Sequence, residues 1–254
     1  MRRREFITLL GGAAASWPLT ARAQQPDRVR RIGVLMGPSD EPETEKRIAV
    51  FEQALRELGW INGGNVRIDV RWGAGNADNI RKYAAELVAL GPDVILASGG
   101  PVLASMLKAT RTVPIVFVIV ADPVGSGFVA SLSRPGGNAT GFMQFEYSLS
   151  GKWLELLKQI VPSLTRAAVL WDPAIASGIG QFAVMQSVAP SIGVELSPIN
   201  VRDAGEIEHA ITAFARESNG GLIMTTGPLV SVRRNLIITL AARHKLPAVY
   251  PNRY

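Results

Sequence analysis

The sequence predicts an α/β protein with two similar lobes, each built on a parallel sheet with helices on both faces. Three observations support this fold class. The chain has 254 residues, of which 47% are hydrophobic and 19% charged, so it can bury one large core or two modest ones. Short apolar runs alternate with amphipathic segments from residue 31 onward. The same series restarts after residue 142, and such alternation is typical of parallel sheets.

The first series contains four expected strands and three expected helices. The segment 43–58 illustrates the argument, because Ile48, Phe51 and Leu55 recur with the period of a helix and Gly59 ends it. The apolar runs between the amphipathic segments are too short for helices and are therefore assigned as strands. The expected strands are 32–36, 66–72, 93–97 and 114–120, and the other expected helices are 79–90 and 101–109.

The second series repeats the pattern. Its helix 150–161 places Trp153, Leu154 and Leu157 on one side, as an amphipathic helix requires. Each half of the chain then has about 110 residues, a size that can fold around a core of its own. The other expected helices are 179–189, 204–216 and 232–243, and the expected strands are 166–171, 193–199, 221–224 and 247–250.

The stretch 112–142 joins the two halves. An apolar strand ends there at Asp122-Pro123, a short helix is expected next, and a Gly-rich turn ends in Thr140-Gly141. We interpret this stretch as a hinge beside a polar site. The expected organisation is an export signal at 1–23, a first lobe at 24–122, a crossover at 123–142 and a second lobe at 143–254.

Residues 1–23 have the pattern of a secretory signal peptide. Three arginines precede an apolar run at 6–19, and Ala21-Arg22-Ala23 has the small-x-small pattern of a cleavage site. Arg3-Arg4-Glu5-Phe6 also resembles the twin-arginine export motif. The apolar run is too short to cross about 30 Å of hydrocarbon. We therefore expect a periplasmic protein, cleaved after Ala23, by either the twin-arginine or the Sec route.

Composition and motifs argue against several classes of function. The chain has no cysteine, and its two histidines, His209 and His244, fall in charged helical segments, so we expect no disulfide and no metal site. Much of the net charge of +6 lies in the four arginines of 1–23, and no basic tract follows, so we expect no nucleic-acid partner. A Gly-x-Ser-x-Gly elbow, a Walker loop and a dinucleotide fingerprint are absent, so we expect no enzyme and no cofactor.

The candidate site residues of the first half follow its strands, because ligands of parallel sheets bind beyond the carboxyl ends of the strands. Ser98, Gly99 and Gly100 open the helix 101–109, where free N–H groups suit an anion and glycine lets a ligand approach the backbone. A plain strand-to-helix turn is the alternative. Asp122, which precedes Pro123, is suited to accept a hydrogen bond from a ligand amine or to cap the short helix that follows.

In the second half, the strand ends carry an aromatic residue and two hydroxyls. Trp171 ends one strand and is suited to stack on an apolar or aromatic ligand; ordinary packing between helix and sheet is the alternative. Thr225 and Thr226 follow the strand 221–224. We expect these side chains to face the strand ends of the first half.

The assembled features resemble the substrate-binding proteins of ABC transporters, in the branch related to tryptophan- and tyrosine-binding lipoproteins. The resemblance covers almost the whole chain. Each stretch alone is weak evidence, but together they are specific. The stretches that carry it are Met1 to Gly12, Arg31 to Met36, Phe51 to Trp60, Leu87 to Ala97, Asp122 to Val129, Arg134 to Phe142 and Gly151 to Lys158.

This resemblance implies a type I periplasmic-binding-protein-like fold, in which two Rossmann-like lobes close over a small ligand such as an amino acid or an aromatic acid. It implies a monomer that presents the closed form to an ABC permease in the inner membrane. A ligand-sensing module of the same fold, partnering a receptor, is the alternative. The implied ligand-binding residues are Ser98, Gly99, Gly100, Asp122, Pro123, Asn138, Thr140, Trp171, Thr225 and Thr226.

The C-terminal end departs from the family pattern. Family members run further and cross back into the first lobe, whereas this sequence stops at Tyr254. We therefore expect a C-terminally truncated member with weaker coupling between the lobes and an incompletely covered sheet in the first lobe.

Overall fold

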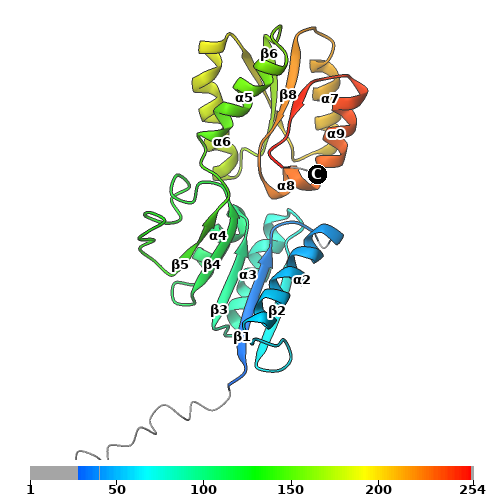
Figure 1. Ribbon diagram of the computed structural model, residues 1–254. Coiled ribbons are helices and arrows are strands. Elements are labelled where there is room, and N and C mark those ends of the chain that lie inside the picture. The colour runs from blue at the N-terminus through cyan, green and yellow to red at the C-terminus, as the bar shows by residue number, and fades with distance from the viewer. Residues whose placement is uncertain (1–27, 40, 253–254) are drawn as a thin grey trace, which may run out of the picture.

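The computed structural model describes residues 28–39 and 41–252, and in it two lobes are stacked end to end (Figure 1). The predicted signal peptide lies outside the described residues. Within them, no helix is both long and apolar enough to span a bilayer. The two parallel sheets confirm the predicted α/β class.

The first lobe is a five-stranded parallel sheet in the order β2-β1-β3-β4-β5. The order reverses between β1 and β3, so the connections leave these two strands on opposite sides and open a crevice at their carboxyl ends. The strands are β1 (Arg30–Met36), β2 (Val66–Trp72), β3 (Val94–Ser98), β4 (Ile115–Val120) and β5 (Ala139–Met143), and the helices are α2 (Pro42–Glu57), α3 (Ala77–Ala89) and α4 (Gly100–Ala109).

Strand β5 replaces the Gly-rich turn expected around Thr140-Gly141. It pairs in parallel with β4, with Phe117 opposite Gly141, and the register shifts before Val120 meets Met143. The backbone of Gly141 lies so close to that of Phe117 that a Cβ would overlap it. The glycine therefore permits a close strand pair, and the first sheet extends to Met143.

The segment after Pro123 also differs from the expectation. It forms hydrogen-bonded turns rather than a short helix: the N–H of Ser126 donates to the carbonyl of Asp122 at 2.8 Å and that of Gly127 to the carbonyl of Val124 at 2.9 Å, without a continued helical series. Gly125 and Gly127 interrupt the segment, and glycine has a low helix propensity. The chain then returns to the sheet as β5 before it enters the second lobe.

The second lobe is a four-stranded parallel sheet in the order β7-β6-β8-β9, which reverses between β6 and β8. Its carboxyl ends point toward those of the first sheet (Figure 1). The strands are β6 (Arg166–Trp171), β7 (Glu195–Asn200), β8 (Gly220–Met224) and β9 (Ala248–Val249), and the helices are α5 (Leu149–Ile160), α6 (Ala176–Val188), the 3-10 helix Ala189–Ile192, α7 (Ala204–Phe214), α8 (Pro228–Val232) and α9 (Arg234–Arg243).

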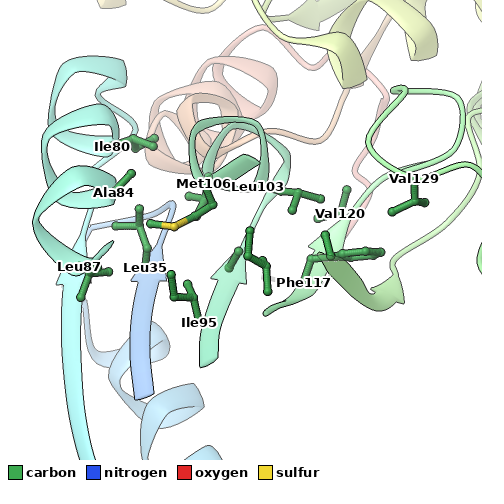
Figure 2. Packing of buried hydrophobic residues seen from close by; sticks show 14 residues of the cluster. Leu35, Ile80, Ala84, Leu87, Ile95, Leu103, Met106, Phe117, Val120 and Val129 are labelled. Atoms are coloured by element: carbon green, nitrogen blue, oxygen red, sulfur yellow. The ribbon is translucent and has the colours of Figure 1, made fainter. Parts of the chain in front are cut away.

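Separate cores hold the two lobes. Figure 2 shows the first, where Leu87 of α3, Met106 of α4 and Phe117 of β4 are almost fully buried. The other face of this sheet carries α2, of which only Thr44 is buried. The second sheet has a core on each face, one beneath α7 and α9 and one beneath α5 and α6. Each lobe is thus a rigid body that can present loops at its strand ends.

Candidate ligand-binding cleft

A cavity of about 310 Å³ lies between the carboxyl ends of the two sheets. Its position follows from the strand orders. In each sheet the order reverses between two neighbouring strands, and the carboxyl ends of those strands reach the cavity. Its size falls at the small end of the range for small-molecule sites. The lining residues are Pro38, Glu41, Glu43, Thr44, Arg47, Ser98, Gly99, Gly100, Pro101, Ile119, Ala121, Gln144, Ser177, Thr226, Gly227, Pro228, Ser231, Arg234 and Asn252.

The first-lobe wall contains the loop Ser98-Gly99-Gly100. Ser98 is 2% exposed, and its carbonyl accepts from the N–H of Gly37 at 3.1 Å, which ties the ends of β3 and β1 together. Gly99 is the N-cap of α4 with φ of 104°, a conformation that favours glycine. The loop therefore brings the positive end of α4 to the cavity.

The second-lobe wall contains Thr226 and Ser177. Thr226 follows β8, and Ser177 stands in the first turn of α6. The fully buried Gln181 connects them: its Nε2 donates to the hydroxyl oxygen of Thr226 at 2.9 Å and to the carbonyl of Ser177 at 2.7 Å. The N–H of Thr226 donates to Oε1 of Gln181 at 3.0 Å. This wall is thus polar and held by a buried amide.

Among the described residues, two side-chain pairs make polar contacts between the lobes at the cavity. Arg234 of α9 and Glu41, which precedes α2, form an ion pair with Nη2 and Oε2 3.0 Å apart. The amide of Gln144 donates to the side-chain oxygen of Asn252 at 3.1 Å. Charged and amide groups from both lobes therefore meet at the edge of the cavity.

Four of the residues predicted from the sequence line the cavity together: Ser98, Gly99, Gly100 and Thr226. Thr225 lies beside them but is fully buried, and its hydroxyl donates to the carbonyl of Leu170 at 2.9 Å. That bond fastens the end of β8 to β6, which are neighbours in the second sheet. The strand-end rule therefore located one loop in each lobe.

Asp122 and Pro123 do not line the cavity; the preceding residue, Ala121, does. The Asp122 carboxylate accepts from the N–H of Gly125 at 2.7 Å and from the N–H of Tyr147 at 3.3 Å. It caps the turn that stands where a short helix was predicted, and it links that turn to the segment leading into α5.

Tyr147 completes a hinge cluster, by which we mean Asp122, Ser126 and Tyr147. The hydroxyl oxygens of Ser126 and Tyr147 are 2.5 Å apart. Burial raises the pKa of the Tyr147 hydroxyl, with a smaller upward contribution from the Asp122 charge, while the bond to Ser126 opposes it. The cluster lies where the chain passes from the first lobe to the second.

Asn138, Thr140 and Trp171 lie outside the cavity lining. The Asn138 amide donates to the carbonyl of Val113 at 2.8 Å, at the amino end of β5. Thr140 is exposed on β5. Trp171 stacks on Phe182 of α6 with ring centroids 4.7 Å apart, which is the packing alternative considered for it.

The sequence analysis predicted none of the charged residues that line the cavity. Glu41 and Ser177 follow β1 and β6 by a few residues, so a search extended further beyond each strand end finds them. Arg47, Arg234 and Asn252 carry no such signal, because they reach the cavity from helices and from the C-terminal segment. In the described part of the chain, no three His, Asp or Glu side chains are grouped to hold a metal ion.

Two facing parallel sheets with a cavity at their strand ends define a two-lobed protein of periplasmic-binding-protein-like fold. Comparison with protein-family models assigns the chain: residues 31–253 match the family described as ABC transporter substrate binding protein. The chain belongs to this family, as predicted. It is a family of binding proteins rather than enzymes.

Individual relatives agree with this assignment. The chain is 25% identical over 210 residues to the tyrosine-binding protein of Clostridioides difficile, covering 83% of this chain and 60% of that protein. It therefore spans about three fifths of the length of this curated relative.

Solved structures share the fold. The ABC domain in complex with L-Trp from Streptococcus pneumonia superposes with a TM-score of 0.77 at 21% identity, covering 88% of this chain and 74% of that one. A solute-binding protein of an ABC transporter from Rhodopseudomonas palustris, in complex with 3,4-dihydroxybenzoic acid, gives 0.63 at 13% identity, covering 89% and 62%.

Proposed function

We propose that this protein is the extracytoplasmic solute-binding protein of an ABC importer and binds a small organic solute in the cleft between its lobes. The observation that carries the proposal is the cavity of about 310 Å³ whose walls bring Ser98 from the first lobe and Thr226 from the second to one space. A ligand that touches both walls stabilises the closed arrangement, because it makes both sets of contacts only there.

The ligand class is an amino acid or an aromatic acid. The relatives support it, since one is named a tyrosine-binding protein and two of the similar structures hold L-Trp and 3,4-dihydroxybenzoic acid. The cavity supports a ligand with a carboxylate, because the N-terminus of α4 and hydroxyl groups face it. The partner in this role is an ABC permease, and the site of action is the periplasm after cleavage behind Ala23.

Thermal unfolding of the mature protein with L-tyrosine, L-tryptophan and 3,4-dihydroxybenzoate tests the proposal. A ligand at about one hundred times its Kd stabilises the folded state by about 2.7 kcal/mol, which raises the Tm by roughly 5–10 °C for a chain of this size. An unchanged Tm with all three compounds, and with a wider set of amino acids, argues against the proposal.

A matched pair of substitutions locates the site. Thr226→Val removes a hydroxyl from the cavity wall, and we expect it to weaken binding by roughly 5- to 30-fold, the usual cost of a hydrogen bond in a buried site. Thr140→Val removes a hydroxyl that is exposed on β5 and serves as the control. Isothermal titration calorimetry measures both. Equal losses from the two variants contradict the assignment of the cleft.

A further inference from the structure

Gln181 is a fully buried amide whose hydrogen bonds all lead to the cavity wall. It stands on α6 and is 0% exposed. Its two Nε2 protons go to the Ser177 carbonyl at 2.7 Å and the Thr226 hydroxyl at 2.9 Å, and its Oε1 accepts the Thr226 N–H at 3.0 Å. Both of these partners line the cavity, while Gln181 itself does not.

The backbone of Gln181 is held as well. The hydroxyl of Ser150 lies 3.0 Å from the carbonyl of Gln181 and 2.6 Å from that of Tyr147, and Ser150 is fully buried. Ser150 thereby links α6 to the start of α5. With its backbone and its side chain both held, Gln181 has little freedom to turn its amide.

This geometry determines the direction in which the Thr226 hydroxyl donates its proton. Because that oxygen accepts a proton from Gln181, its own proton has to be donated in another direction. No described residue accepts it, and Thr226 borders the cavity. The reverse amide orientation is excluded, because it would set the N–H groups of Gln181 against the N–H of Thr226. The hydroxyl is therefore a preset donor toward a ligand.

We infer that Gln181 is a positioning residue of the binding site, and that it selects ligands that place an acceptor, such as a carboxylate or carbonyl oxygen, against Thr226. The inference rests on the proposed function, since it concerns a ligand in the same cleft. The orientation favours binding because the Thr226 hydroxyl is already directed at the ligand before it arrives, so little rotamer freedom of this side chain is lost on binding.

A double-mutant cycle tests the inference, with L-tyrosine and L-tryptophan as probes and calorimetric affinity as the readout. Gln181→Met removes the amide with little change in shape, and we expect about a tenfold loss of affinity. On the Thr226→Val background the same change is expected to cost less than about twofold, because the hydroxyl that Gln181 orients is gone. Thr226→Ser keeps the hydroxyl and should bind nearly as wild type.

An equal loss from Gln181→Met on both backgrounds overturns the inference, since it would show only a general effect on folding. If Gln181→Met does not fold, Gln181→Glu takes its place. Its ionised carboxylate accepts the Thr226 hydroxyl proton and turns the donor away from the ligand, so affinity falls between about pH 6 and about pH 9. The inference is also overturned if Gln181→Glu binds the probes with wild-type affinity at about pH 9, or if its affinity falls equally with pH on the Thr226→Val background.

Hydrogen exchange separates this inference from the proposed function. In the ligand-free wild type, the Thr226 amide is expected to exchange slowly, because it is bonded to Oε1 of Gln181. It should lose that protection in Gln181→Met, which has no acceptor there, and keep it in Gln181→Glu, whose carboxylate still accepts the N–H. If the wild type binds neither probe, the proposed function fails for these ligands. Unchanged protection of the Thr226 amide in Gln181→Met then rejects the positioning role itself.

Discussion

We expect the ion pair between Arg234 and Glu41 to favour the closed arrangement of the two lobes. The pair joins the start of α9 to the segment before α2 across the cavity, with 3.0 Å between Nη2 and Oε2. The side chains are 21% and 35% exposed, so the pair is partly shielded from solvent. Arg234→Gln removes the charge while keeping a polar side chain, and it is expected to favour the open arrangement of the lobes.

The size of the effect follows from this partial burial. At an effective dielectric constant of about 20, two unit charges at hydrogen-bonding distance attract by roughly 5–6 kcal/mol, but desolvation and side-chain ordering offset most of this attraction. Exposed pairs retain about 0.2–1 kcal/mol, and a partly shielded one is expected near the upper end. A loss of about 1 kcal/mol changes the ratio of closed to open molecules by about fivefold.

Fluorescence energy transfer between the lobes measures this ratio. The chain has no cysteine, so Lys46→Cys and His209→Cys can place one dye on α2 and one on α7 at exposed positions. We expect lower transfer in Arg234→Gln than in the parent, and a loss of the difference at about 1 M salt, where the Debye length is about 3 Å.

The matched control is Arg243→Gln, which breaks a 3.0 Å pair with Glu208 inside the second lobe. It makes the same chemical change without touching the contact between lobes. Equal transfer in Arg234→Gln and Arg243→Gln at low salt would refute the claim that the Arg234 pair holds the lobes closed.

Three further predictions concern the hinge and the first lobe. Gly180→Ala places a methyl group on the Tyr147 ring, so we expect a loss of about 1–3 kcal/mol of stability in chemical unfolding, and an unchanged midpoint would contradict it. Because burial raises the pKa of Tyr147, the contribution of its hydroxyl to stability is complete below about pH 10 and is lost as the pH rises further. The free energy of unfolding should therefore fall less steeply above about pH 10 in Tyr147→Phe than in the wild type. The N–H of Arg31 lowers the pKa of Asp93, so its contribution is present above about pH 4 and is lost as the pH falls further; Asp93→Asn should lower stability at pH 7 but not at low pH.

Most of the fold could be predicted because its signals are local. The apolar period marks the helices, and strand, helix and strand in series imply parallel pairing. Strand β5 was not predicted, because the signal for it is not local. Gly136, Gly137 and Gly141 indicate a turn, and only the close approach of the Phe117 backbone explains why Gly141 lies in a strand. The turn after Pro123 was wrongly predicted as a short helix, although Gly125 and Gly127 are a local signal against one.

The site was less predictable, because the strand-end rule gives the edge of a sheet and not the direction of each side chain. It found Ser98 and Thr226, which border the cavity. It also selected Trp171, whose ring is used in packing on Phe182. Arg234 reaches the cavity from helix α9 of the second lobe. This placement depends on how the two lobes are stacked, which the sequence pattern does not give.

The hinge cluster and the cavity wall are joined by the side chain of Ser150. Its hydroxyl lies within hydrogen-bonding distance of the Tyr147 carbonyl and of the Gln181 carbonyl. Tyr147 is bonded to Asp122 at the crossover, and Gln181 is bonded to Thr226 at the cavity. Asp122 was selected from the sequence as a ligand contact, yet its carboxylate is used inside the hinge. Its influence on binding therefore has to pass through the orientation of the lobes, so Asp122→Ala should change lobe opening more than the chemical selectivity of the cleft.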